Sequence, residues 1–135
     1  MMFIKETWLR SSGDEIKCND LTRPGYTLNS LACDSRGGGI ALLAKNSVAH
    51  LIKYTSKFTF NHTSFEQIHA TIWLHQVVNI FCLYHPSPSR INKLSFTLFL
   101  EEFPNLLEFS NSIAGSPIIL GDFNLQFDQQ NSPDV

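Results

Sequence analysis

The sequence is poor in charge and has no excess of either sign. Charged residues make up 16% of its 135 residues, well below the roughly 25% of ordinary globular proteins. Lys+Arg 10 against Asp+Glu 12 leaves a formal net charge of −2. This balance argues against a broad cationic surface for nucleic acid, although it leaves room for a local patch.

Cysteines are few, and they lie far apart at Cys18, Cys33 and Cys82. They form no Cys-x-x-Cys pair, so the spacing supports neither a zinc knuckle nor a thioredoxin-like motif. An odd number of distant cysteines also argues against a disulfide framework and favours a reducing compartment. No stretch approaches the roughly 18 apolar residues of a membrane helix. We therefore expect a soluble protein without a membrane partner, located in the nucleus or the cytoplasm.

Apolar residues, by contrast, are plentiful. They make up 43% of the chain and include 11 phenylalanines, which is enough material to offset the ordering entropy of a folded core. The length favours one domain, which we take to span residues 1–135.

The apolar pattern predicts an α/β fold in which a helix packs on a sheet. Alternating or near-continuous apolar residues predict strands at 3–4, 26–28, 40–44, 68–74, 77–84 and 118–120. A helix is predicted at residues 89–110, with Ser89 as its N-cap, and Pro104 should kink or split it near Phe103. Residues 10–20 are polar and are expected to form a loop.

A glycine run, Arg36-Gly37-Gly38-Gly39, precedes the apolar residues 40–44. It indicates either a tight hairpin or a place where two backbone segments approach closely. A phosphate-binding P-loop is not supported, because no Gly-Lys-Ser/Thr and no helix follow.

Polar side chains stand at the ends of several predicted strands. Asp122 and Asn124 follow the last strand, and a rigid strand aims the residues that come after it. The pair offers a hydrogen-bond acceptor and a donor to one ligand, although the same residues also suit a simple turn. Glu6 follows the first strand, where it is either a ligand for Mg²⁺, which wants one or two carboxylates, or an ordinary surface glutamate.

Tyr84 and His85 follow the buried strand in the same way. The tyrosine hydroxyl can donate to a phosphate and the histidine can serve in acid–base chemistry. The alternatives are packing at the edge of the core for Tyr84 and an ordinary loop position for His85. The other histidines show no metal-ligand spacing and receive no role: His50, His62, His69 and His75.

Several of these fragments together resemble a known family. In chain order they are Lys5-Glu6-Thr7-Trp8-Leu9, Pro24-Gly25-Tyr26, Arg36-Gly37-Gly38-Gly39-Ile40-Ala41-Leu42-Leu43, Ser64-Phe65-Glu66, Leu83-Tyr84-His85-Pro86 and Gly121-Asp122-Phe123-Asn124. The series resembles the endonuclease/exonuclease/phosphatase superfamily. Within it, the nearest branch is the apurinic-type endonuclease domain of LINE-like non-LTR retrotransposons. The resemblance spans nearly the whole chain.

The resemblance implies a fold, an activity and a site. The fold is a DNase I-like, four-layered α/β sandwich, and the activity is hydrolysis of DNA phosphodiesters with Mg²⁺ or Mn²⁺. Glu6 is similar to the family's metal-ligating glutamate, and Tyr84 to a tyrosine that contacts the phosphate. Asp122 matches the aspartate that orients or deprotonates the attacking water, and Asn124 the asparagine that holds the phosphate and that aspartate. The family usually has Tyr-Arg-Pro-Pro where this chain has Tyr-His-Pro-Ser, which leaves the role of His85 open.

The chain also departs from the family. The resemblance implies a further strand before residue 1, and a catalytic Asp and His beyond residue 135. We therefore expect a partial domain with impaired or absent turnover and with an exposed sheet through which it self-associates. The alternative is a non-catalytic retroelement remnant, at most a weak nucleic-acid or protein-binding module. A phosphatase or phospholipase branch is disfavoured by the Arg-Gly-Gly-Gly and Glu-Thr-Trp-Leu contexts.

Overall fold

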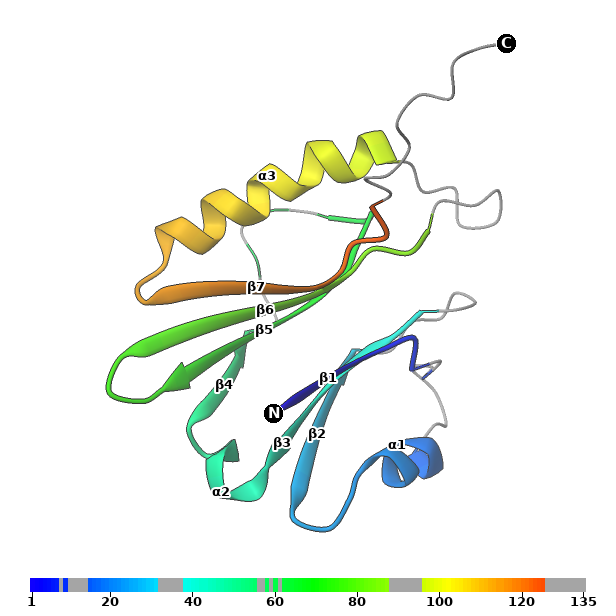
Figure 1. The fold of residues 1–135 in the computed structure, drawn as a ribbon, viewed down its shortest axis with the longest axis vertical. Helices are drawn as coiled ribbons and strands as arrows, with labels where there is room; N and C mark the ends of the chain where they lie inside the picture. Colours follow the sequence, from blue (N-terminus) through cyan, green and yellow to red (C-terminus); the bar gives the residue numbers. More distant parts are fainter. Residues whose placement is uncertain are drawn as a thin grey trace.

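The computed structural model describes residues 1–7, 9, 15–31, 38–55, 58, 60, 62–87 and 96–125. The chain runs through strands and helices in a mixed order (Figure 1). In sequence they are β1 (Met2–Lys5), α1 (Glu15–Leu21), β2 (Tyr26–Leu31), β3 (Ile40–Lys45), α2 (Asn46–Ala49), β4 (Ile52–Thr55), β5 (Glu66–Trp73), β6 (Val77–Tyr84), α3 (Phe96–Ser112) and β7 (Ser116–Asp122).

The strands form two sheets. A three-stranded antiparallel sheet has the order β1-β3-β2, and a four-stranded sheet has the order β4-β5-β6-β7. In the larger sheet only β6 and β7 run parallel. Helix α3, which follows β6 in the sequence, returns the chain to the end of the sheet where β6 began, and β7 starts there. The carboxyl ends of β6 and β7 therefore lie side by side.

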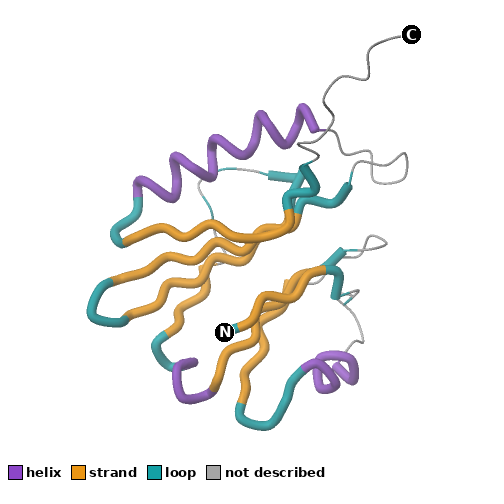
Figure 2. The backbone as a smooth tube through the Cα atoms, in the orientation of Figure 1, coloured by secondary structure: helices purple, strands orange, loops and turns teal. Residues whose placement is uncertain are grey.

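The two sheets pack face to face around an apolar core (Figures 1 and 2). Buried residues of β3, β5 and β6 meet there: Ile40, Leu42, Ile68, Ala70, Ile80, Cys82 and Tyr84. On the other face of the larger sheet, α3 covers a second cluster, formed by Phe65, Phe81, Leu83, Phe99 and Leu106. Successive side chains of β6 thus enter different layers, which explains why its sequence is almost continuously apolar.

The predicted strands at 40–44, 68–74, 77–84 and 118–120 are confirmed by β3, β5, β6 and β7, and the two short ones by β1 and β2. The mixed α/β class with a helix packed on a sheet is also confirmed. Strand β4 and the single turn α2 were not predicted. No helix among the described residues is long and apolar enough to cross a membrane.

The prediction of a loop over residues 10–20 is wrong at its end, where Glu15–Leu21 forms α1. Cys18 and Leu21 are both half-buried, and residues three apart share one side of a helix. Thr22 closes the last turn, because its backbone N–H and its hydroxyl both donate to the carbonyl of Cys18, at 3.0 and 2.7 Å. On the opposite side of the three-stranded sheet from the larger sheet, α1 stands beside β2 (Figure 1).

Helix α3 runs through Pro104 as one helix, so of the predicted kink or split near Phe103 the split is wrong. Proline lacks the N–H that would bond to the carbonyl of Leu100. Both residues are exposed, Leu100 to 54%, so water can satisfy this carbonyl while the apolar face of the helix stays packed. The predicted N-cap, Ser89, lies outside the described residues.

Candidate functional site

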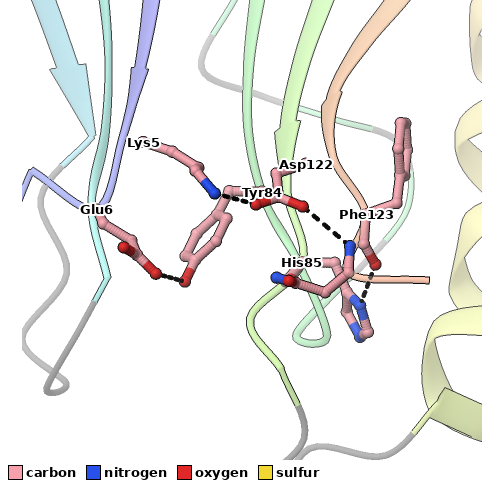
Figure 3. A network of polar contacts seen from close by, with 7 residues as sticks. Lys5, Glu6, Tyr84, His85, Asp122 and Phe123 are labelled. Atoms are coloured by element: carbon pink, nitrogen blue, oxygen red, sulfur yellow. Dashed lines mark hydrogen bonds and ion pairs between the residues drawn. The ribbon is translucent and has the colours of Figure 1, made fainter. Parts of the chain in front are cut away.

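Polar side chains from both sheets converge where β1, β6 and β7 end (Figure 3). The register explains why, since Glu66, Tyr84 and Asp122 stand opposite one another across β5, β6 and β7. Glu6 follows β1 directly on the facing sheet. Residues far apart in the sequence are therefore brought to one end of the sandwiched sheets.

The hydroxyl of Tyr84 donates to Oε1 of Glu6 at 2.7 Å. Burial raises the pKa of Tyr84 well above its usual value, and the hydrogen bond to Glu6 and the nearby carboxylates of Glu66 and Asp122 raise it further. The phenol therefore stays protonated and acts as a donor at neutral pH. The ring itself is 3% exposed and belongs to the core between the sheets.

Asp122 forms an ion pair with Lys5 across the two sheets. The hydrogen bond from Lys5 is the main reason that the pKa of Asp122 lies below its usual value, and the backbone N–H of Asn124 adds to the effect by donating to Oδ1 at 3.1 Å. Asp122 is therefore a carboxylate throughout the neutral range, able to accept a proton or orient a water.

His85 ties the ends of β6 and β7 together. Its backbone N–H donates to the carbonyl of Asp122 at 2.9 Å, and its carbonyl accepts from Nδ2 of Asn124 at 2.6 Å. Because Nδ1 bonds to the carbonyl of Phe123 at 2.8 Å, Nδ1 carries the ring proton. The ring is fully buried against Phe99. The residue whose role the sequence left open thus positions Asp122 and Asn124, and its buried ring does not favour acid–base chemistry at the site.

Glu6 and Asn124 share an uncommon backbone conformation. They are the two non-glycine residues with positive φ among the described parts of the chain, at 51° and 46°. Such conformations cost energy and gather at functional sites, where the surrounding structure holds them in place. Both residues were predicted site residues, and Glu6 is the more unusual of the two, because Asn adopts this conformation more readily than other non-glycine residues.

Gly39 fixes the segment that follows Glu6. Its carbonyl accepts from the N–H of Thr7 at 3.0 Å, and its own N–H donates to the carboxylate of Glu66, 2.9 Å from the nearer oxygen. It has φ +90°, and a Cβ there would stand 2.4 Å from Oγ1 of Thr7. Of the two interpretations of the glycine run, close approach holds at this residue.

Gly121 allows an equally close approach inside the larger sheet. A Cβ on it would lie 1.9 Å from the carbonyl oxygen of Leu83. Any larger residue would push β7 away from β6 just before Asp122. This glycine therefore sets the spacing between Tyr84 and Asp122.

All four predicted site residues meet at this end of the sheets, in the pairs Glu6–Tyr84 and Asp122–Asn124. Sequence reasoning missed Lys5 and Glu66. Lys5 was adjacent to a candidate but looks like any exposed residue at a strand end. Glu66 begins an apolar strand, and only the hydrogen bond from the Gly39 N–H, made between the two sheets, shows that it faces Gly39.

The described residues contain no group of three or more His, Cys, Asp or Glu that could hold a metal ion. Mg²⁺ needs only one or two carboxylates, because waters and substrate phosphate complete its shell. Within the described part of the chain, Oε2 of Glu6 accepts no hydrogen bond, while Oε1 accepts from Tyr84. Of the two predicted carboxylates, Glu6 is thus the one that keeps an oxygen open to such a cation, because both oxygens of Asp122 accept hydrogen bonds.

Comparison of the chain with protein-family models, with curated proteins and with solved structures finds no match.

Proposed function

We propose that this site is that of a metal-dependent DNA endonuclease, which hydrolyses phosphodiester bonds. The observation that carries the proposal is the convergence of Glu6, Tyr84, Asp122 and Asn124 at one end of two facing sheets, with strained backbone at Glu6 and Asn124. The sequence resemblance to the endonuclease domain of LINE-like non-LTR retrotransposons points to the same chemistry. The fold proposed with it is part of a DNase I-like, four-layered α/β sandwich.

Each residue has a chemical task in this proposal. Glu6 would hold Mg²⁺ or Mn²⁺, which supplies positive charge to the phosphate as negative charge develops on it. The hydroxyl of Tyr84 and the amide of Asn124 donate to phosphate oxygens. Asp122, kept ionised by Lys5, orients the attacking water and accepts its proton.

A second candidate is a non-catalytic binding module. It is favoured by one observation, namely that the carboxylates of Glu6 and Asp122 already have partners within the chain. Lys5 pairs with Asp122, and Tyr84 donates to Glu6. A site closed in this way holds its shape without a substrate.

Nicking of supercoiled plasmid in Mg²⁺, with EDTA as the blank, tests the proposal. Nicking should be lost in both Glu6→Gln and Asp122→Asn, which keep the size of each side chain. Glu101→Gln, which changes an exposed carboxylate on α3, is the matched control and should nick like the parent chain.

Titration with Mn²⁺, followed by NMR line broadening, separates the two candidates. Broadening around Glu6 together with nicking supports the endonuclease. Broadening without nicking supports the binding module. If the signals of Tyr84 and Asn124 stay sharp, or broaden equally in Glu6→Gln, the metal site is wrong.

A further inference from the structure

Lys5 brings a positive charge into a site that is otherwise built from carboxylates and neutral hydrogen-bond donors. It is the last residue of β1, and its ammonium group pairs with Oδ2 of Asp122 at the end of β7, on the facing sheet (Figure 3). The two residues lie 117 positions apart in the sequence. The contact is therefore set by the way in which the two sheets face each other.

The surroundings of this ammonium group are negative. The carboxylates of Glu6, Glu66 and Asp122 are all close enough to Tyr84 to raise its pKa. The hydrogen bond to Asp122 is the main reason that the pKa of Lys5 lies above its usual value, and the charges of Asp122 and Glu6 add to the effect. Lys5 is therefore charged throughout the neutral range and balances part of the negative charge of the site.

Tyr84 stands next to both halves of the site. Nζ of Lys5 lies over its ring, 6.0 Å from the centroid, and its hydroxyl donates to Oε1 of Glu6 at 2.7 Å. A cation at such a distance from an aromatic ring is weakly attracted to it. The two carboxylates beside Tyr84 thus have partners of different charge, a neutral phenol for Glu6 and an ammonium group for Asp122.

This difference decides what each carboxylate offers to a metal ion. The hydroxyl that binds Glu6 is neutral and does not repel a cation. On Asp122, Oδ1 accepts from the N–H of Asn124 at 3.1 Å and Oδ2 from Lys5. A carboxylate oxygen has a second lone pair, so Asp122 is not short of acceptor sites. What opposes a metal ion there is the charge of the ammonium group, because like charges a few ångströms apart repel each other.

We propose that Lys5 keeps a divalent cation off Asp122 and so confines it to Glu6. The ammonium group serves as an internal counter-ion, which supplies part of the positive charge that the carboxylates need and leaves Asp122 free of metal. Lys5 is a positioning residue, because it acts through Asp122. The inference rests on the proposed function, in which Glu6 holds Mg²⁺ or Mn²⁺ and Asp122 orients the attacking water.

The separation of the two carboxylates matters for the proposed chemistry. Asp122 would lose more of its basicity to a bound divalent cation than to the single charge of Lys5, because a larger positive charge favours the carboxylate form more strongly. A carboxylate that ligates the metal also has fewer lone pairs left for a water. With the cation held at Glu6, Asp122 stays able to accept the proton of the attacking water.

A titration with Mg²⁺ at neutral pH, followed by NMR through the carboxyl carbons of Glu6 and Asp122, tests the inference. In the parent chain the Glu6 signal should shift and saturate, while the Asp122 signal shifts much less. In Lys5→Met, which keeps the length of the side chain and removes its charge, both signals should shift. Mg²⁺ should also bind this variant about 5-fold more tightly, the upper end of what an exposed ion pair contributes.

The control variants separate the charge of Lys5 from its packing. Lys5→Arg keeps the charge and should restore the parent pattern, whereas Lys5→Gln, which lacks it, should match Lys5→Met. Lys53→Met removes an exposed lysine of β4, at the far edge of the larger sheet from β7, and should behave as the parent chain does. Combining Asp122→Asn with Lys5→Met should cancel the gain in affinity, because the second carboxylate is gone.

Two results would overturn the inference, namely equal shifts of Glu6 and Asp122 in the parent chain, or an unshifted Asp122 signal in both Lys5→Met and Lys5→Gln. If the parent chain nicks DNA and gives either result, the role of Lys5 fails and the proposed function stands. If the expected pattern is found and the parent chain does not nick DNA, the endonuclease fails and the role of Lys5 stands. If no signal shifts in any variant, both fail, since these carboxylates then bind no metal.

Discussion

Tyr84 and Glu6 are 78 positions apart in the sequence, yet the hydroxyl of one donates to the carboxylate of the other at 2.7 Å. The contact joins the end of β6 to the residue that follows β1, and so connects the two sheets at the candidate functional site (Figure 3). A buried phenol and a carboxylate in this arrangement hold each other in place. The geometry of the site therefore depends on the packing of the sheets.

Tyr84→Phe should destabilise the chain by about 1 kcal/mol, because the hydrogen bond from the buried phenol to Glu6 is lost while water solvates the exposed carboxylate. Chemical denaturation measures the change. Tyr26→Phe is the matched control, since the hydroxyl of Tyr26 makes no hydrogen bond to another described residue, and it should stay within about 0.5 kcal/mol. Equal effects of the two substitutions would show that the Glu6 contact contributes nothing specific.

Lys5→Gln should raise the pKa of Asp122, because the charged hydrogen-bond donor that lowers it is replaced by a neutral one. An NMR titration of the Asp122 carboxyl carbon reports the shift directly. Lys53→Gln changes an exposed lysine on β4 and should leave the titration of Asp122 as it is. An unchanged midpoint in Lys5→Gln would mean that the ion pair does not persist in solution.

Gly39→Ala should destabilise the chain by more than Gly25→Ala does. Both glycines have positive φ, +90° and +83°, but a Cβ on Gly39 meets Oγ1 of Thr7 at 2.4 Å, whereas nothing lies within 4 Å of one on Gly25. Gly25→Ala should cost about 1–2 kcal/mol for the conformation alone, and Gly39→Ala should cost at least about 1 kcal/mol more.

Thermal or urea unfolding measures this difference. Thr7→Ala removes the atom that the new Cβ would meet, so the double variant should recover part of the extra loss. Additive effects of Gly39→Ala and Thr7→Ala would contradict the close contact.

Glu102 should make the free energy of unfolding depend on pH, through its hydrogen bonds between α3 and the segment before β5. Burial tends to raise the pKa of Glu102, but the hydrogen bonds from Ser64 and Thr63 outweigh it and hold the pKa below the usual 4.5. A depressed folded pKa stabilises the fold above the unfolded value, and this contribution is lost as the pH falls below about 4.5.

Glu102→Gln should therefore cost about 1 kcal/mol at pH 7, and the difference from the parent chain should shrink toward pH 3. Unfolding free energies at several pH values give the curve. The neighbouring Glu101→Gln, on the exposed side of α3, should not change it. A difference that stays constant with pH would rule out the carboxylate as the cause.

Strands β3, β5 and β6 could be predicted because their pattern is local, either alternating or continuously apolar over five or more residues. Strand β7 could be predicted from the shorter apolar run 118–120 that ends at Gly121. The short elements β4 and α1 could not be predicted in this way. Strand β4 spans four residues and α1 seven, so neither gives a clear period, and their stability comes from neighbours that the local sequence does not identify. The effect of Pro104 was misjudged for a related reason. The free-energy cost of a proline inside a helix depends on whether water can reach the carbonyl that loses its hydrogen bond, here that of Leu100.

The candidate site was predictable residue by residue but not as an assembly. Glu6, Tyr84, Asp122 and Asn124 each looked like polar residues at strand ends, and each had an ordinary alternative. Which ends meet is set by the order of strands within each sheet and by how the sheets face, and neither follows from a local pattern. The partner of Asp122, Lys5, could be found only from the three-dimensional structure.

The parallel pairing of β6 with β7 has a consequence for how the chain acquires its site. Tyr84 and Asp122 become neighbours only after α3 has carried the chain back across the sheet, and Glu6 joins them from a distance of 78 positions. Contacts between such distant segments are slow to form, because the entropy of closing each loop is lost before the contact stabilises it. We therefore expect the polar cluster to form later in folding than the local pairings of β5 with β6 and of β2 with β3.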